Sequence, residues 1–421
     1  MGTLMFPQAL GADPGRPGPA ADADRSDLAA DPGQRNLTGA PERPVRVLVV
    51  DDSLFMRMLI RSLLEEDPAI QVVGQARDGL EGLARAEELD PDVITLDVEM
   101  PRLGGLGMLE RLMGRDPRPV VMVSGLTREN AEATIASLRL GAVDFLTKPS
   151  GSVSTDLPRL RRELQAKVKA AATLGKGGVR RVMGSSPPPL PAATPPGPPL
   201  VPAAAGEHPI VEHPAGKQQP RRTRAAQRLV VVGASTGGPS ALHLLVAALA
   251  GRVSRLAPVA MVIVQHIPPG FSTAMARSLA QTARGVLRVE EATSERPLQA
   301  GDVLLAPGGY HVRVTPGPAV ELSLEPPVAG VRPAVDITLL SAVEVFRRRI
   351  LALILTGMGS DGLRGARAVR EAGGRVIAQD RETSVVYGMP RAVAEAGQAD
   401  AVLPLRGIPE AVAAWWNSRV A

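Results

Sequence analysis

A serine lies on a glycine-rich turn between a predicted strand and a predicted helix, where acyl-transfer chemistry is readily built. The turn, residues 233–240, reads Gly-Ala-Ser-Thr-Gly-Gly-Pro-Ser; the apolar run 229–232 precedes it and the amphipathic stretch 241–249 follows. Ser235 would then expose its hydroxyl at a strand's carboxyl end, beside the N–H groups of a helix N-terminus. A serine that only caps the helix is the alternative interpretation.

A nucleophilic serine needs a general base, and the base needs a carboxylate that orients it. His266 directly follows the predicted strand 261–265, and Asp361 follows the predicted strand 350–355. If these strands and 229–232 belong to one parallel sheet, their carboxyl ends share an edge and the three side chains can meet. The order Ser, His, Asp differs from that of α/β-hydrolases, so the turn does not predict that fold.

The other histidines are weaker candidates for the base. His243 is expected inside the helix that follows the serine turn, where a packed or solvated side chain is typical. His311 opens a further predicted strand and could either line the site or be structural. His208 and His213 lie in a proline-rich stretch.

A second motif offers a different function. Residues 357–362 read Gly-Met-Gly-Ser-Asp-Gly, a formal G-x-G-x-x-G, and Asp380 ends the next predicted strand. That spacing is typical of a dinucleotide-binding fingerprint, so a nicotinamide-dependent enzyme is one alternative. This interpretation leaves Ser235 and His266 without a role, which favours the hydrolase.

Carboxylates also gather at predicted strand ends in the first half of the chain. Asp51 and Asp52 close the first strand, Asp97 closes the strand 93–96, and Lys148 follows the last one. In a parallel sheet these three carboxylates and one ammonium converge at one edge. Clustered carboxylates repel one another and favour a divalent cation, and oxygen ligands suit Mg²⁺.

The composition excludes several classes of protein. The chain of 421 residues has no cysteine, which excludes disulfides, thiol catalysis and cysteine-type zinc sites. No secretory signal and no apolar run near the length of a membrane span are present, so a cytoplasmic protein without membrane insertion is expected. The net charge is +5, but no basic helix is interleaved with aromatic residues, so nucleic acid is not expected as a partner.

The alternation of apolar and amphipathic segments predicts two α/β domains. We expect a disordered N-terminal extension over 1–44 and then a doubly wound parallel five-stranded sheet over 45–165. A helix end and a Pro/Arg-rich linker are expected over 166–228. A second, Rossmann-like α/β domain is expected over 229–416. The first sheet is predicted from strands at 45–50, 70–73, 93–96, 120–123 and 145–146, with helices at 54–64, 79–89, 131–140 and 157–172.

Residues 45–165 resemble a bacterial response-regulator receiver, through the segments 47–53, 96–101, 122–125 and 141–149. The resemblance implies that Asp97 accepts a phosphoryl group and that Asp51 and Asp52 join it in binding Mg²⁺.

The same resemblance implies roles for three further receiver residues. Lys148 would pair with the phosphoryl group, Ser124 would move to hydrogen-bond it, and Phe145 would be the switch aromatic, with core packing as its alternative. Gly104-Gly105 replaces the usual Asp-Gly, which is expected to loosen the following loop without touching a phosphorylation residue.

Residues 231–405 resemble the chemotaxis protein-glutamate methylesterase family, which also has a receiver, a linker and this domain in this order. The matching motifs lie at 233–239, 264–271, 306–311, 332–336, 355–362, 378–380 and 384–390. The resemblance implies Ser235 as nucleophile, His266 as base and Asp361 as its orienting carboxylate. It further implies that the backbone N–H of Met358 binds the oxyanion and that Thr236 lies in the site.

The implied activity is hydrolysis of glutamate methyl esters, and deamidation of glutamines, on chemoreceptor helices. A CheA-type histidine kinase would donate the phosphoryl group, and the hydrolysis would need no cofactor. Ala329 and Val331 replace the family's usual Asn and His, which puts the fit to the receptor helix in question. A non-catalytic binding module controlled by the receiver is the remaining alternative.

Overall fold

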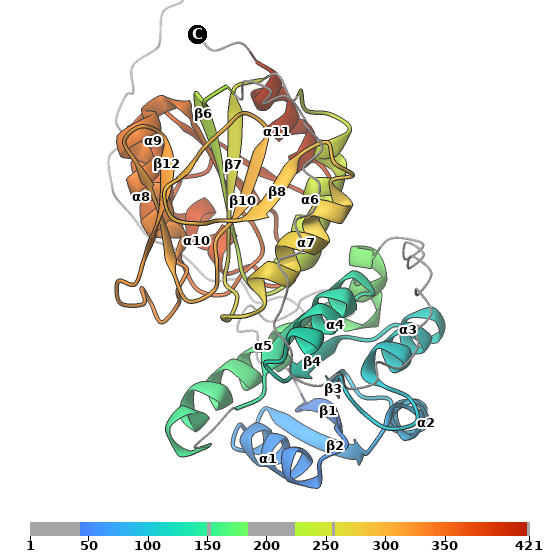
Figure 1. Cartoon of the computed structure of the whole chain (residues 1–421). Coiled ribbons are helices and arrows are strands. Elements are labelled where there is room, and N and C mark those ends of the chain that lie inside the picture. Colours follow the sequence, from blue (N-terminus) through green and yellow to red (C-terminus); the bar gives the residue numbers. More distant parts are fainter. Residues whose placement is uncertain (1–42, 150–152, 184–223, 255–256, 419–421) are drawn as a thin grey trace, which may run out of the picture. The chain divides into compact units, whose positions relative to one another are not determined.

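The computed structural model describes residues 43–149, 153–183, 224–254 and 257–418, which form two α/β domains (Figure 1). All but the last two residues of the predicted N-terminal extension, and most of the predicted linker, lie outside these ranges. Within them, no helix has both the length and the hydropathy that a membrane span requires.

The first domain is the predicted doubly wound sheet of five parallel strands, in the order β2-β1-β3-β4-β5. Its strands are β1 (Val45–Val50), β2 (Ile70–Ala76), β3 (Val93–Asp97), β4 (Val120–Ser124) and β5 (Asp144–Thr147). Its helices are α1 (Leu54–Glu65), α2 (Gly79–Leu89), α3 (Gly105–Arg115), α4 (Arg128–Arg139) and α5 (Val153–Met183). Polar caps begin three of the helices, because Ser53, Asp78 and Thr127 each accept a hydrogen bond from a first-turn amide.

Helix α5 is longer than the sequence pattern predicts. We expected the helix to end near 172 and the linker to follow, but α5 continues to Met183, with a kink at Gly175 where φ is 55°. Val179, beyond the kink, is 2% exposed and packs in the same hydrophobic cluster as Leu138 of α4. Burial of an apolar side chain therefore supports helix in a segment whose own composition does not favour it.

The second domain is built on a seven-stranded parallel sheet in the order β15-β14-β13-β6-β7-β10-β8. The strands are β6 (Arg228–Ala234), β7 (Val259–Gln265), β8 (Arg288–Glu291), β10 (Asp302–Leu305), β13 (Ile350–Ile354), β14 (Arg375–Gln379) and β15 (Ala401–Leu403). A small antiparallel sheet contains β9 (Arg296–Pro297), β11 (His311–Thr315) and β12 (Ala319–Ser323). The chain reverses its direction of winding between β6 and β13, and ligand sites form at such switch points.

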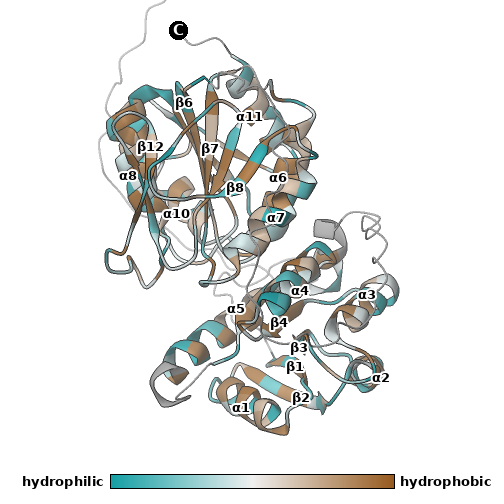
Figure 2. Ribbon diagram, in the orientation of Figure 1, coloured by the Kyte–Doolittle hydropathy of each residue, from teal (hydrophilic) through white to brown (hydrophobic). Residues whose placement is uncertain are grey.

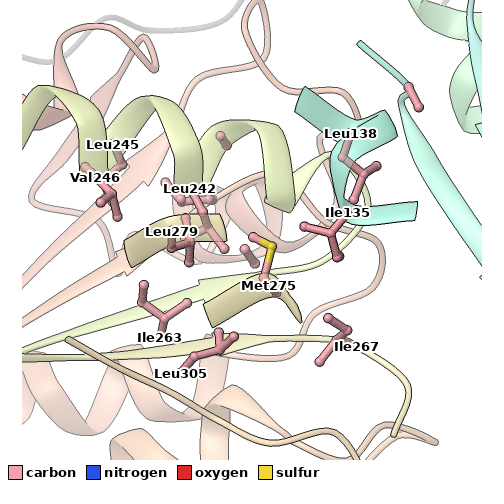
Figure 3. Packing of buried hydrophobic residues seen from close by; sticks show 14 of the residues in the cluster. Ile135, Leu138, Leu242, Leu245, Val246, Ile263, Ile267, Met275, Leu279 and Leu305 are labelled. Atoms are coloured by element: carbon pink, nitrogen blue, oxygen red, sulfur yellow. The ribbon is translucent and has the colours of Figure 1, made fainter. Parts of the chain in front are cut away.

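Helices cover both faces of this sheet (Figure 1). One face carries α6 (Gly238–Ala250), α7 (Ser272–Thr282) and α11 (Ile408–Asn417); the other carries α8 (Val335–Phe346), η1 (Arg347–Arg349), α9 (Leu363–Glu371) and α10 (Met389–Glu395). Strand β7, buried on both faces, is hydrophobic along most of its length (Figure 2). Leu242 of α6 and Ile263 of β7 are fully buried in this core (Figure 3), and truncating such a leucine to alanine costs roughly 2–5 kcal/mol.

The described parts of the two domains belong to one compact unit. Ile135 and Leu138 of α4 join the hydrophobic cluster that contains Met275 of α7 (Figure 3). The Ser240 hydroxyl donates to the Leu138 carbonyl at 3.3 Å, and Arg277 pairs with Glu132 at 2.9 Å. Helix α4 of the first domain is therefore seated on α6 and α7 of the second.

Candidate active site and phosphoacceptor site

The turn that carries Ser235 is held by close backbone packing. The Ser235 amide donates to the Thr356 carbonyl at 3.0 Å, which fastens the turn to the end of the neighbouring strand β13. Gly237 has φ 77°, and a Cβ there would lie 2.5 Å from Val385. A Cβ at Gly238 would lie 2.0 Å from the Gln265 side-chain oxygen. Both glycines are thus required for the turn that presents the serine.

Gln265 is a residue of this site that the sequence analysis did not single out. Its Nε2 donates to the carbonyls of Ser235 at 2.9 Å and His266 at 3.1 Å. One buried amide therefore bridges the ends of β6 and β7. Its place as the last residue before His266 was the only signal in the sequence.

His266 and Asp361 meet at the carboxyl edge of the sheet. His266 Nε2 lies 2.8 Å from Asp361 Oδ2, which leaves Nδ1 as the ring nitrogen available to a substrate or nucleophile. Burial alone would raise the pKa of Asp361, but the hydrogen bond and charge of His266 and two backbone amides outweigh it, so this pKa lies below its usual range. Asp361 therefore remains ionised, as a carboxylate that orients an imidazole requires.

The amides that hold Asp361 belong to the first turn of α8. Val335 N donates to Oδ2 at 2.6 Å and Asp336 N donates to Oδ1 at 2.9 Å. Both oxygens of the carboxylate are thereby occupied, and the positive end of the helix dipole favours its charge. The ring of His266 thus faces a carboxylate of fixed orientation.

Ser235, Thr236, His266 and Met358 line one cavity of about 1050 Å³. No hydrogen bond between the Ser235 hydroxyl and His266 is present among the described residues, and such contacts are commonly looser before substrate binds. Over the same ranges, the backbone amides of Thr236 and Met358 have no hydrogen-bond acceptor. Free amides beside a serine hydroxyl are the groups that an oxyanion hole requires.

The other two histidines of this domain have packing partners instead. His243 contacts the hydroxyls of Thr282 at 2.9 Å and Ser278 at 3.2 Å, and burial, with a smaller effect of Arg139, lowers its pKa to about 4. His311 is fully buried, and its Nδ1 accepts from the Ala334 amide at 3.1 Å. Neither side chain lines the cavity that Ser235 lines.

The groups that would bind a dinucleotide in and after the motif 357–362 already have hydrogen-bond partners within the protein. The Gly365 amide of α9, where a dinucleotide's phosphate would be expected to bind, donates to Asp336 Oδ1 at 2.8 Å. Asp380, the expected ribose ligand, accepts from the Thr383 amide at 3.0 Å and from its hydroxyl at 2.5 Å. Asp361, inside the motif, is bound to His266. These contacts favour the serine site over the dinucleotide site.

The first domain gathers its carboxylates at one edge. Oxygens of Asp51, Asp52 and Asp97 lie within 4.8 Å of one another. Lys148 Nζ pairs with Asp51 Oδ2 and Asp97 Oδ2, each at 2.8 Å. Burial raises the pKa of Asp97 to about 6, although Lys148 acts in the opposite direction. Three hard oxygen donors, one of them exposed, fit a divalent cation.

The two predicted switch residues lie in different surroundings. The Ser124 hydroxyl donates to the Gly125 carbonyl at 3.3 Å, and no hydrogen bond between it and Asp97 is present in the described part of the chain. Phe145 packs against Phe271 of the second domain, with ring centroids 4.7 Å apart. Gly105 follows the loop after Asp97, and a Cβ there would lie 2.0 Å from the Asp97 carbonyl. In the pair Gly104-Gly105, the second residue must therefore be glycine for steric reasons.

Comparison with known proteins shows the family of this chain. A model of the CheB methylesterase matches residues 230–412, and a model of the response regulator receiver domain matches residues 47–155. A protein-glutamate methylesterase/protein-glutamine glutaminase of Symbiobacterium thermophilum is 48% identical over 380 residues, covering 88% of this chain and 97% of that protein. The chain belongs to the CheB methylesterase family. It is accordingly a hydrolase of the methylesterase type that is regulated through a receiver domain.

Two further proteins similar to this chain come from other organisms. The protein-glutamate methylesterase/protein-glutamine glutaminase of Pyrococcus abyssi is 38% identical over 381 residues, covering 89% of this chain and 94% of that protein. The crystal structure of the Thermotoga maritima CheB methylesterase catalytic domain has 42% sequence identity and a TM-score of 0.42, and covers 44% of this chain and 97% of that one. The receiver domain implies Mg²⁺ binding for phosphorylation, which the donor set of the three aspartates fits.

The two residues expected to depart from the family's pattern lie at the cavity that Ser235 lines. Ala329 and Val331 line it together with Arg332. Ala329 adopts φ 50°, and Val331 forms an isolated bridge with Val328. Both positions therefore lie in the wall of the cavity, outside the contact between His266 and Asp361.

Proposed function

We propose that Ser235, His266 and Asp361 hydrolyse glutamate methyl esters on the signalling helices of chemoreceptors. The observation that carries the proposal is the 2.8 Å contact between His266 Nε2 and Asp361 Oδ2, at the edge of the cavity that Ser235 lines. It leaves His266 Nδ1 as the nitrogen that takes the serine proton.

The reaction follows the usual course of acyl transfer. Ser235 Oγ attacks the ester carbonyl while His266 Nδ1 takes its proton, and the amides of Met358 and Thr236 bind the negative oxygen. His266 then protonates the leaving oxygen, so methanol departs and an acyl-serine remains. Water, deprotonated by His266, attacks that acyl group and releases the glutamate carboxylate and free serine. A glutamine side chain that enters the same route loses ammonia instead of methanol.

Regulation uses the receiver domain. Asp144, Phe145 and Lys148 line the same cavity as Ser235, so the receiver in this arrangement occupies part of the space that a receptor helix needs. A CheA-type histidine kinase would phosphorylate Asp97, with Mg²⁺ held by the three aspartates. The added charge would compete for Lys148 and release the receiver from the cavity. We place the protein in the cytoplasm, where the signalling helices of its receptors lie.

The test is methanol release from methylated receptor membranes. Ser235→Ala and His266→Ala should abolish turnover, and Asp361→Asn should lower it by about 10⁴-fold, by analogy with other triads. Ser278→Ala is the matched control, because Ser278 contacts a different histidine, His243, outside the site. Its turnover should stay near the wild-type rate. Normal turnover by a folded Ser235→Ala protein would refute the nucleophile assignment.

A further inference from the structure

Asp336 and Asp361 each accept hydrogen bonds from backbone amides at the start of the other residue's helix. Asp361, just before α9, accepts from the first-turn amides of α8 at 2.6 and 2.9 Å. In return Asp336, in the first turn of α8, accepts from the Gly365 amide of α9 at 2.8 Å, and the Gly362 amide also stabilises its ionised form. Each carboxylate thus satisfies amides at the start of the other helix.

Neither helix has a side-chain cap of its own. The N-cap residue is Ala334 for α8 and Gly362 for α9, and neither provides a side-chain oxygen. The first amides of a helix have no partner within it, and a buried start without acceptors is costly. The start of α9 therefore depends on Asp336.

We infer that Asp336 is a positioning residue for Asp361, because it anchors the start of α9 and with it the turn that presents Asp361 to His266. The inference rests on the proposed function, in which His266 is the base. In this chain of hydrogen bonds Asp361 lies between His266 and Asp336. Asp336 therefore acts on His266 only through Asp361.

The close packing of the two helices makes this support rigid. A Cβ at Gly365 would lie 2.4 Å from Leu339 Cβ, so α9 lies against α8 at this point. Asp336 is 5% exposed and Asp361 is 7% exposed. Burial raises the pKa of Asp336, and so does the charge of Asp361, while Arg364 and the α9 amides act in the opposite direction. Two buried carboxylates remain together here because each has its own set of amide donors.

Two substitutions separate position from charge. Asp336→Asn keeps an oxygen that can accept from the Gly365 amide but removes the charge, whereas Asp336→Ala removes both. Asp336→Ala should lower kcat by roughly 100-fold, the cost of a small misplacement of a catalytic group, and leave KM unchanged. Asp336→Asn should restore most of the rate.

The proton shared by His266 Nε2 and Asp361 distinguishes positioning of Asp361 from a merely structural role, which would leave its NMR resonance unchanged. Its low-field proton resonance should be present in the full-length wild type and in Asp336→Asn, and lost in Asp336→Ala. The acid limb of the pH profile of kcat/KM should move to lower pH in Asp336→Ala more than in Asp336→Asn, because a displaced Asp361 no longer stabilises the imidazolium. Asp302→Ala, which removes another buried carboxylate in the same domain, should leave both readouts unchanged.

Three results decide the matter. Equal losses of kcat in Asp336→Ala and Asp336→Asn with the resonance intact would overturn the inference, since charge alone would then explain them. So would an unchanged effect of Asp336→Ala in an Asp361→Ala background, because Asp336 would not act through Asp361. If the wild type shows no esterase activity, the proposed function fails, while loss of the resonance in Asp336→Ala and its retention in Asp336→Asn still support the positioning role.

Discussion

The ring of Phe145 in the receiver domain packs against the ring of Phe271 in the esterase domain, with centroids 4.7 Å apart and planes inclined by 33°. Phe145 lies in β5, directly before the segment that carries Lys148, and Lys148 pairs with Asp97. Phe271 is the N-cap residue of α7, at the end of the segment that begins with His266. The predicted phosphoacceptor and the candidate catalytic cavity are thus connected by one ion pair, one aromatic contact and two short segments of chain.

Phe145→Ala should raise the esterase rate of the unphosphorylated protein. Loss of a buried aromatic contact weakens the docking of the receiver, and each 1.4 kcal/mol shifts an equilibrium about tenfold. Methanol release without a phosphodonor measures the effect, with a melting curve to verify that the receiver remains folded. Phe55→Ala is the matched control, because Phe55 is 61% exposed on α1. An unchanged rate in folded Phe145→Ala would show that this contact does not restrain the enzyme.

A small-molecule phosphodonor with Mg²⁺ should raise the esterase rate of the full-length protein. Asp97→Ala should abolish the rise while leaving the basal rate intact, because Asp97 is the predicted acceptor and lies outside the catalytic cavity. Asp52→Ala should weaken the rise and make it require more Mg²⁺, since it removes the exposed member of the proposed ligand set. Persistent activation of Asp97→Ala would assign the phosphoryl group to another residue.

The carboxyl of Asp97 should titrate near pH 6 without metal. Burial raises its pKa above the ordinary 3.8, so the folded state binds this proton more tightly than the unfolded state does. Asp97 therefore lowers stability as pH rises from about 4 to about 6, and Asp97→Asn should flatten that part of the profile. Mg²⁺ favours the ionised form and should move the midpoint down. Carbon NMR of the carboxyl group measures the titration, and a midpoint near 4 without metal would contradict the prediction.

Nicotinamide dinucleotides should not bind at millimolar concentration. The amide that would hold a phosphate at the start of α9 already donates to Asp336, and Asp380 is bonded to Thr383. Calorimetry on the full-length protein provides the test, with Asp380→Ala as the comparison. Saturable binding that disappears in this variant would restore the dinucleotide interpretation.

Local sequence patterns determined the fold class and the neighbourhood of the chemistry. Alternating apolar and amphipathic segments predict parallel α/β sheets, and in such sheets residues at strand ends meet at one edge. That rule alone predicts that Ser235, His266 and Asp361 meet, and that Asp51, Asp97 and Lys148 do. It depends only on spacing along the chain, which the sequence displays directly.

The tertiary structure decided which of these groups have partners. Asp336 and Asp361 bind amides of each other's helices, and Gln265 bridges the ends of two strands. These contacts join segments far apart in the chain, and no periodic pattern in the sequence predicts them. Helix α5 extends past its predicted end because Val179 is buried against a distant helix. Likewise, nothing local to Phe145 distinguishes a core aromatic from one that packs against Phe271. Such contacts depend on how the helices and strands pack, because tertiary packing determines which partners lie next to a buried polar or apolar group.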